Sequence, residues 1–399
     1  MINRSYNASW RYIFTIVALL CLWSLPVFGG EITVGAARTS VYAPLLKGKR
    51  VALLSNHTGL VGARHTLDVM LDEGINVVTL FSPEHGFRGT ADAGEHVKNG
   101  VDEVTSIPIA SMYTGTSKGI APEVMKGLDV IVVDLQDVGT RFYTYYITMI
   151  KVMEEAAAAG KKVVVLDRPN PLGMVVDGPV LDMSLRSGVG RLPVPVLHGM
   201  TLGELAMMAN GEGWLREGRK VDLTVVECEG YTHASRYKLP VAPSPNLRDM
   251  TAIYLYPSLC FFEGTVASVG RGTDFPFKVY GHPDMQNRGF TFMPRSVPGA
   301  KNPPLLNRRC NGVDLTRSDS DSLIARGVDL TYVIDAYQSM PATGRSRFFS
   351  AFFDKLIGNR KVRLMIIDGL SADEIKKSWT DEVEEFKTLR SQYLLYPES

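Results

Sequence analysis

Dense groups of polar side chains follow four apolar stretches of this sequence. Each group comes directly after a run typical of a buried β-strand. The four groups span residues 55–59, 82–86, 134–139 and 167–171. A single group of this kind would be an ordinary turn, because Asn, Asp, Ser, Gly and Pro favour turns. Turns do not call for Glu84, His85 or the nearby Arg141, so these positions indicate a functional site.

The chemistry that these residue types suit best is carbohydrate chemistry. Carboxylates such as Asp134 and Asp137 lie close to the aromatic residues Tyr143 and Tyr145 in the sequence. In glycoside hydrolysis one acid protonates the glycosidic oxygen, and a second group stabilises the oxocarbenium-like transition state. A second polar block spans residues 263–274, where glycines permit tight turns and Arg271 can hold an anion.

The motifs of other common site classes are missing from the sequence. No GxGxxG opens a helix after the first strand, and there is no GxxxxGK[ST], GxSxG or HExxH. His57, His85 and Asp134 can be imagined as metal ligands, but their spacing does not specify a metal site. We therefore expect no metal and no cofactor.

The elements that must position these groups alternate between strand and helix. Strands are expected at 50–54, 76–81, 129–135, 162–167 and 222–227, with a weaker one at 108–113. Helices are expected at 66–73, 122–127, 142–159 and 201–210. Continuous apolar strands that alternate with helices predict an α/β doubly wound, mostly parallel sheet. Ligands of such sheets bind at the carboxyl ends of the strands, where all four polar groups fall.

The composition of the chain changes after about residue 285. Four prolines between residues 294 and 304 interrupt it, and helices are expected at 330–337, 347–357 and 371–389. Ser371 and Glu374 have the spacing of a capping box. We expect an α/β domain over 31–285 and a smaller, α-containing C-terminal domain over 286–399.

The first 29 residues predict a secretory signal peptide. Arg4 and Arg11 precede an apolar stretch at 12–28, and two glycines follow before the first acidic residue. The mature protein is then exported to the periplasm or secreted, with no stable membrane span. Lipidation at Cys21 is a less favoured alternative, because leucines stand where small residues are preferred. Cys228, Cys260 and Cys310 remain after cleavage, and the sequence leaves their pairing open.

The overall charge adds one exclusion. The chain carries 43 basic and 42 acidic residues, so it has no electrostatic signature of nucleic-acid binding.

Several long motifs, in order along the chain, resemble those of the bacterial exo-β-N-acetylmuramidase family. They are LSNHTG (54–59), SPEHGFRG (82–89), VDLQDVGTRFYTY (133–145), LDRPNPLG (166–173) and EGTVASVGRGTD (263–274). Met174 departs from the family pattern, which has a second glycine after Gly173. The resemblance runs from about residue 45 to 290, and the tail is similar to the family's second domain.

This resemblance implies a Rossmann-like domain joined to a smaller C-terminal domain, with the active cleft between them. The implied activity is release of N-acetylmuramic acid from the non-reducing end of peptidoglycan fragments, in cell-wall turnover and recycling. The partners are then peptidoglycan-derived saccharides and muropeptides. Glu84 is the family's candidate catalytic acid.

The roles of the catalytic candidates follow from this chemistry. Glu84 follows a buried strand and Pro83, and partial burial would raise its pKa and suit it to general acid catalysis. His85 would tune or orient Glu84. Asp134, Asp137 and Asp274 are candidates for base, nucleophile or orienting group. Alternatively, the acetamido group of the substrate attacks the anomeric carbon while one aspartate positions it.

The substrate-binding candidates reflect the chemistry of muramic acid. Its lactyl carboxylate requires a cation or amide donors, and Arg141 and Arg271 are the first candidates, followed by Arg88. Tyr143 and Tyr145 would stack on a sugar ring. The rest of the expected substrate-binding set is Asn56, His57, Asn170 and Glu263.

Two other functions remain open at this point. An amidase or deacetylase would act on the same fragments, and a periplasmic muropeptide-binding protein would keep the crevice without needing Glu84.

Overall fold

The computed structural model describes residues 31–83, 86–87, 100–112 and 119–399. The expected signal peptide, with Cys21, lies outside the described residues. Residues 33–399 form one unit. Among the described residues, no helix combines the length and the apolar composition needed to cross a membrane.

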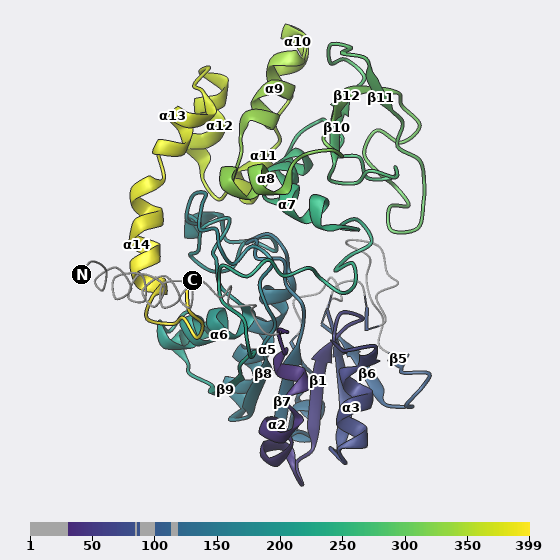
Figure 1. Ribbon diagram of the computed structural model, residues 1–399, viewed down its shortest axis with the longest axis vertical. Helices are drawn as coiled ribbons and strands as arrows, with labels where there is room; N and C mark the ends of the chain where they lie inside the picture. Colours follow the sequence, from purple (N-terminus) through teal and green to yellow (C-terminus); the bar gives the residue numbers. More distant parts are fainter. Residues whose placement is uncertain (1–30, 84–85, 88–99, 113–118) are drawn as a thin grey trace, which may run out of the picture. The chain divides into compact units, whose positions relative to one another are not determined.

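A seven-stranded sheet lies at the centre of the N-terminal part, in the order β5-β6-β4-β1-β7-β8-β9 (Figure 1). Six neighbouring strands run parallel, and the short edge strand β5 pairs antiparallel with β6. The strands are β1 (Val51–Ser55), β4 (Val77–Ser82), β5 (Gly100–Val101), β6 (Pro108–Ser111), β7 (Val130–Asp134), β8 (Lys162–Leu166) and β9 (Asp222–Val226). The α/β doubly wound prediction is confirmed.

Helices pack on both faces of this sheet, which explains why the inner strands are apolar throughout. On one face, α2 (Thr39–Leu46) and α3 (Thr66–Asp72) share a core with Val51, Val132 and Val164. On the other face, α5 (Tyr145–Ala159) and α6 (Leu202–Gly211) pack against the alternate side chains of the same strands. The short helix α4 (Pro122–Lys126) begins with proline at its first position.

Local signals in the sequence set the ends of these helices. Gly160 ends α5 with a φ of 63°, a conformation that favours glycine. Thr201 and Glu204 form a reciprocal capping box at the start of α6. A two-stranded hairpin, β2 (Leu60–Val61) with β3 (Arg64–His65), leads into α3, whose N-cap is His65.

The C-terminal part contains a three-stranded antiparallel sheet in the order β10-β12-β11 and a series of helices. The strands are β10 (Val279–His282), β11 (Phe290–Phe292) and β12 (Cys310–Asp314). The helices are α7 (Met250–Leu259), α8 (Ser320–Arg326), α9 (Thr331–Ser339), α10 (Ala342–Arg345), α11 (Ala351–Ile357), α12 (Arg360–Ile367), α13 (Ala372–Lys377) and α14 (Thr380–Arg390). Short 3₁₀ helices η2 (Gly35–Ala37), η3 (Met183–Leu185), η4 (Arg216–Gly218) and η5 (Cys260–Gly264) lie in the connections.

Two expectations for this part require correction. A domain boundary at residue 285 would divide the small sheet, because β10 precedes that residue and pairs with β12 after it. The single helix expected at 371–389 is two helices, α13 and α14. The chain turns at Trp379, whose indole is buried and donates to Asp177 Oδ1 at 3.0 Å. The capping box of Ser371 with Glu374 is confirmed.

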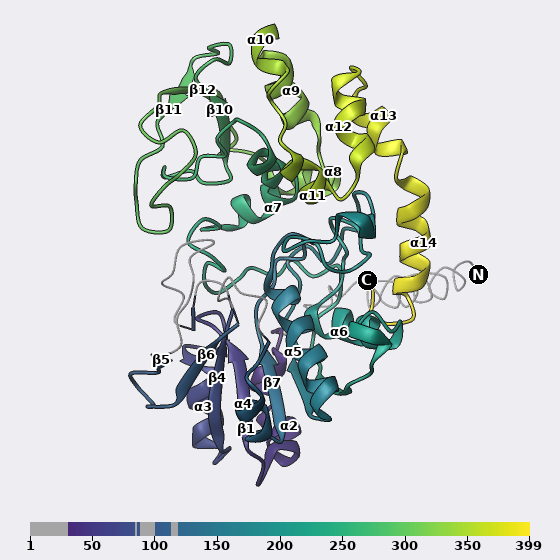
Figure 2. The ribbon, with the colours of Figure 1, turned by 180° about the vertical axis from the view of Figure 1, so that it is seen from behind.

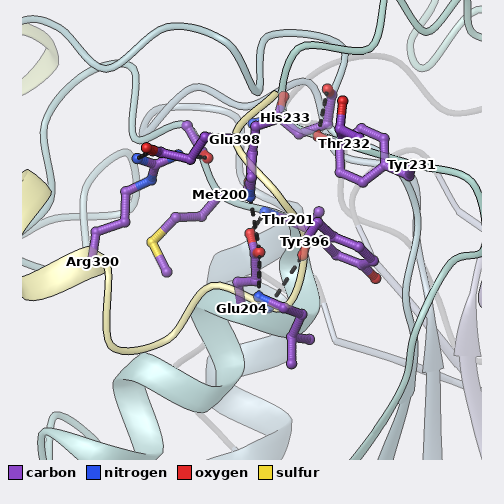
Figure 3. A network of polar contacts seen from close by, with 12 residues as sticks. Met200, Thr201, Glu204, Tyr231, Thr232, His233, Arg390, Tyr396 and Glu398 are labelled. Carbon is purple, nitrogen blue, oxygen red and sulfur yellow. Dashed lines mark hydrogen bonds and ion pairs between the residues drawn. The ribbon is translucent and has the colours of Figure 1, made fainter. Parts of the chain in front are cut away.

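The segment after α14 returns to the N-terminal part. The end of α14 lies beside α6 in both ribbon views (Figures 1 and 2), and the Tyr393 hydroxyl donates to Glu212. Further along, the Tyr396 hydroxyl donates to the buried Asp167 Oδ2 at 2.7 Å. The Leu395 amide donates to Glu204 Oε1 at 2.8 Å. These contacts, of which Figure 3 shows the part around Glu204 and Tyr396, attach the C-terminal segment to the end of β8 and to α6.

The three described cysteines, Cys228, Cys260 and Cys310, are all buried free thiols. Cys228 lies close to the C-terminal segment, because its amide donates to the Tyr396 hydroxyl at 2.9 Å.

Candidate active site

The four strands that precede the polar groups are neighbours in the sheet. They lie in the order β4-β1-β7-β8 and are all parallel, so their carboxyl ends meet at one edge. The order of the strands across the sheet changes direction at β1. The next strands along the chain, β4 and β6, lie on one side of β1, and β7, β8 and β9 lie on the other side. Such a switch point is where open α/β sheets bind ligands.

Side-chain alternation divides the polar residues of this edge between the two faces of the sheet. Asp134 lies on the same face of the sheet as Val130 and Val132. Arg168 lies on the same face as Val164 and Leu166, and this face packs against α2 and α3. There Arg168 forms a two-point ion pair with Asp134, at 2.6 Å from Nε to Oδ1 and 3.0 Å from Nη2 to Oδ2.

This ion pair corrects the expectation for Asp134. Its side chain has no exposed surface, and both carboxylate oxygens bind Arg168. Arg168 also donates to the Leu60 carbonyl at 2.9 Å. A buried carboxylate needs such a partner, so Asp134 supports the structure and is not placed to act as base or nucleophile. The role of Arg168 leaves no local signal in the sequence, because its partner lies 34 residues away.

Asp137 is in a different situation. Its Oδ1 accepts a hydrogen bond from the Gly139 amide at 2.7 Å. Its Oδ2 is buried and has no hydrogen-bond partner among the described residues. Burial raises the pKa of Asp137 to about 7, although the bond from Gly139 favours the charged form. A carboxyl group with this pKa can both give and take a proton near neutral pH.

The turn that holds Asp137 is fixed by neighbouring side chains. Gly139 has a φ of 80°, and any side chain there would collide with the amide of Asn170. Asn170 in turn donates to the Met200 carbonyl at 3.0 Å and accepts from the Leu172 amide at 2.8 Å. Gln136, whose role leaves no signal in the sequence, donates to the carbonyls of Asp137 and Pro169. Asn170 therefore positions the Asp137 turn, which corrects its expected role as a substrate ligand.

Asn56 and His57 lie on the loop after β1. Asn56 Oδ1 accepts from both the amide and the hydroxyl of Thr58, at 3.0 and 2.6 Å. Asn56 Nδ2 is buried without a hydrogen-bond partner in the described part of the chain. His57 is partly exposed, and its Nε2 donates to the Ala242 carbonyl at 2.9 Å, which joins this loop to residues 240–247.

Glu84, His85 and Arg88 lie outside the described residues. The positions that flank the first two are described: Pro83, Gly86 and Phe87 are buried, and the Gly86 amide donates to the Pro83 carbonyl at 3.2 Å. The Phe87 ring lies 5.0 Å from the ring of His65.

His65 connects these flanking residues to the loop after β1. Its Nε2 lies 2.9 Å from the Asn56 carbonyl, and its Nδ1 accepts the Leu67 amide at 3.1 Å. These two bonds require the neutral ring with its proton on Nε2. The residues that flank Glu84 thus contact the part of the edge that carries Asn56.

Arg141 does not hold a ligand. Its side chain is completely buried, and its terminal nitrogens donate to four backbone carbonyls. These belong to Pro179 and Val194, at 2.6 and 2.8 Å, and to Leu356 and Ile357, at 3.1 and 2.8 Å. This corrects the expectation that Arg141 binds a substrate carboxylate. It joins the β8–α6 connection to the end of α11 instead.

Tyr143 and Tyr145 are also interior residues rather than a sugar platform. Both rings are buried, and both hydroxyls donate to the Pro243 carbonyl, at 2.8 and 3.1 Å. The Tyr143 ring also packs edge-on against the Tyr256 ring, with 6.2 Å between the ring centres. The Tyr256 ring packs against the Phe277 ring, with 5.0 Å between the ring centres. These contacts connect the strand edge to the loop that carries Arg271.

Arg271 is held in place and still has free donor groups. Its Nε donates to Glu263 Oε1 at 2.6 Å, and its guanidinium carbon lies 4.9 Å from the centre of the Phe277 ring. Its two terminal nitrogens have no hydrogen-bond partner in the described ranges. Asp274, on the same loop, is exposed. Glu263 therefore orients Arg271 rather than binding substrate by itself.

Within the described ranges, no group of three or more His, Cys, Asp or Glu side chains is placed to hold a metal ion.

Comparison with known proteins identifies the family. The model of the N-terminal domain of the exo-β-N-acetylmuramidase NamZ matches residues 51–251, and that of its C-terminal domain matches residues 254–396. The peptidoglycan β-N-acetylmuramidase NamZ of Bacillus subtilis is 37% identical over 374 residues, which cover 89% of each chain.

Two crystal structures of DUF1343 family proteins from Bacteroides fragilis are similar to this chain. One is 51% identical, with a TM-score of 0.86 over 93% of this chain and 100% of its own. The other is 27% identical, with a TM-score of 0.77 over 92% of this chain and 99% of its own.

The fold and the matches define a two-domain glycosidase built on a Rossmann-like sheet. More specifically, the chain belongs to the NamZ family of exo-β-N-acetylmuramidases.

Proposed function

We propose that this protein is an exo-acting β-N-acetylmuramidase that releases N-acetylmuramic acid from the non-reducing end of peptidoglycan fragments. The observation that carries the proposal is the 37% identity to the Bacillus subtilis enzyme across both domains. The N-terminal segment, with Arg4 and Arg11 before an apolar stretch, supports export to the periplasm or beyond, where such fragments arise.

Glu84 is the proposed general acid. It comes two residues after the end of β4, and the Gly86 amide donates to the carbonyl of the buried Pro83. Phe87 and His65 connect this segment to Asn56, at the end of the adjacent strand β1. A carboxyl group carried at this edge is suited to protonate the glycosidic oxygen of a sugar bound at the switch point.

Asp137 is the proposed second catalytic group. Of the three aspartates considered, Asp134 is neutralised by Arg168 and Asp274 is exposed on a different loop. Asp137 keeps one carboxylate oxygen without a partner in the described structure and has a pKa raised by burial to about 7. We assign it to orient the substrate's acetamido group or to exchange a proton with the attacking nucleophile.

Arg271 is the proposed ligand of the lactyl carboxylate. Glu263 and Phe277 hold its guanidinium from one side, and its terminal nitrogens keep their donor capacity. A guanidinium fixed in this way loses less freedom when it binds a carboxylate with two parallel hydrogen bonds.

The test of the proposed function is turnover of a disaccharide with N-acetylmuramic acid at its non-reducing end. The wild type should release the free sugar, and Glu84→Gln should lower kcat by at least about 100-fold, since general acid catalysis contributes about 10² to 10⁴. Glu103→Gln is the matched control, because Glu103 is exposed and has no role in the proposed mechanism.

Three results would overturn these assignments. Binding of the disaccharide without any release of sugar would favour a muropeptide-binding protein. Release of peptide or acetate in place of sugar would favour an amidase or deacetylase. Activity of Glu84→Gln within a few-fold of wild type, with an unchanged thermal transition, would remove Glu84 from its role.

A further inference from the structure

A surface groove lies between the two parts of the chain, away from the strand edge described above. Three segments form it: the connection between β8 and α6, the start of α12, and one side of α14. Its volume is about 530 Å³. The residues that line it are Val180, Leu181, Asp182, Pro193, Asn359, Arg360, Lys361, Glu382, Glu385, Phe386 and Leu389.

The base of the groove is apolar. Leu181 and Phe386 are buried, and Pro193 and Leu389 are partly exposed. Phe386 and Leu389 lie three positions apart on α14, so they share one side of that helix. A ligand that fills the groove would cover this apolar surface.

The walls of the groove carry opposite charges. Glu382 and Glu385, three positions apart, stand on the α14 wall, and Arg360 and Lys361 stand at the start of α12. Glu382, Glu385 and Lys361 are exposed, and none of them forms an ion pair with another described residue. One wall therefore favours a cation and the other favours an anion.

The start of α12 strengthens the preference for an anion. Its first turn contains two basic residues, Arg360 and Lys361, and no acidic one. Cations at a helix N-terminus oppose the helix dipole. The Arg360 guanidinium donates to the Ser184 hydroxyl at 2.8 Å and lies 3.9 Å from Asp182 Oδ2, so its charge is partly compensated. Lys361 has no such partner in the described structure, so a bound carboxylate would relieve this repulsion.

The walls are held rigidly before any ligand arrives. Arg141 binds the carbonyls of Pro179 and Val194, next to the groove residues of the β8–α6 connection. The same guanidinium binds the carbonyls of Leu356 and Ile357, just before α12. The α14 wall is anchored separately, because Arg390 donates to the Gly199 carbonyl at 3.0 Å (Figure 3 labels Arg390). Rigid walls lower the entropic cost of binding.

We propose that this groove is a second binding site, which takes a short peptide with a free ammonium group and a free carboxylate. The ammonium faces Glu382 and Glu385, the carboxylate faces Lys361 and the start of α12, and the aliphatic carbons between these two groups cover Phe386 and Leu389. The stem peptides of peptidoglycan belong to this chemical class. The choice of a stem peptide as ligand rests on the proposed function, whereas the preference for a zwitterionic peptide does not.

The experiment is isothermal titration calorimetry of the full-length protein with the tripeptide L-alanyl-γ-D-glutamyl-meso-diaminopimelate. We expect saturable binding with a Kd below about 1 mM. Glu385→Lys and Lys361→Glu should each weaken binding by about tenfold. Full acetylation of the amino groups should remove the effect of Glu385→Lys, and full amidation of the carboxylates should remove the effect of Lys361→Glu.

The matched controls are charge reversals outside the groove on nearby helices. Glu384→Lys lies on α14 and Lys355→Glu on α11, and both original residues are exposed and absent from the groove lining. These variants should bind the tripeptide like wild type. All four variants should cleave the peptide-free disaccharide at the wild-type rate, because none of these residues belongs to the assigned active site.

Several results would overturn the proposal. They are no binding of the tripeptide at 5 mM, equal losses in the control variants, or equal binding of the native and fully capped peptides. Self-association that Glu385→Lys abolishes, measured by sedimentation equilibrium without peptide, would assign the groove to a second copy of the chain. Cleavage of the disaccharide without peptide binding refutes the groove alone, and the reverse result refutes the proposed function alone.

Discussion

The burial of Asp137 leads to a prediction about stability: this side chain should reduce the free energy of unfolding at neutral pH. Its pKa lies at about 7 in the folded protein, against 3.8 for the ordinary group. A difference of about 3 pKa units corresponds to about 4 kcal/mol. Between these two values the folded chain holds a proton that the unfolded chain has released. The free energy of unfolding therefore falls as pH rises from about 4 to 7.

The variant Asp137→Asn should remove this pH dependence. An asparagine side chain imitates the protonated aspartate: its oxygen can still accept from the Gly139 amide, and its Nδ2 replaces the oxygen that has no partner. Near pH 4 the variant should match wild type to within about 1 kcal/mol. From pH 5 to pH 8 its advantage in the free energy of unfolding should grow by about 2–3 kcal/mol.

Urea unfolding of both proteins at pH 5, 6, 7 and 8 measures this advantage directly. Asp222→Asn serves as control, because Asp222 is exposed at the start of β9 and its removal should give no pH-dependent difference above about 0.5 kcal/mol. A constant difference between wild type and Asp137→Asn across this range would refute the assigned pKa. Turnover by Asp137→Asn should fall by about 100-fold or more at pH 7, and normal turnover would remove Asp137 from catalysis.

Three further predictions follow from the placement of other residues. Arg168→Ala should lower the free energy of unfolding by about 3–5 kcal/mol, measured with urea, because it leaves the Asp134 carboxylate buried without its partner; a loss below 1 kcal/mol would contradict this role. Arg271→Ala should lower kcat/KM for the muramic acid disaccharide by roughly 10–100-fold while changing it less than about threefold for the same disaccharide without the lactyl group, and equal losses would exclude Arg271 as the lactyl ligand. Tyr143→Phe should leave KM unchanged and cost about 1 kcal/mol of stability, since it removes only the hydrogen bond to Pro243; a large rise in KM would restore Tyr143 as a sugar contact.

The central sheet could be predicted from the sequence because its strands are short, continuous and apolar. An apolar run such as 129–135, with an expected helix before it and after it in the sequence, is best interpreted as a buried strand of a parallel sheet. The β10-β12-β11 sheet could not be predicted in this way. Gly281 and Gly312 stand opposite each other in its paired strands, and a side chain on either would collide with the neighbouring backbone. Glycine lowers the strand signal, although here close packing requires it.

The position of the candidate site could be predicted, whereas the roles of individual residues could not. Polar groups after parallel strands must meet at one edge, so the site follows from topology. The role of each side chain depends on partners distant in the sequence. Arg168 neutralises Asp134 from the next strand, and Arg141 binds carbonyls more than 200 residues away. Such pairs leave no periodic pattern, and a charged residue in a motif can equally bind substrate or the chain's own backbone.

The contact between Tyr396 and Asp167 can form only at the end of translation. Asp167 belongs to the N-terminal domain and accepts from Thr201 and Gly203 there, yet its third donor, the Tyr396 hydroxyl, is translated 229 residues later. A ribosome-bound chain therefore holds that carboxyl without this donor, and without the Leu395 amide that Glu204 accepts, until the segment after α14 emerges. Expression of the N-terminal domain by itself would leave both carboxylates without these donors, so we expect this chain to be more stable when its two domains are produced together. An affinity tag fused close to Tyr396 would interfere with the same step.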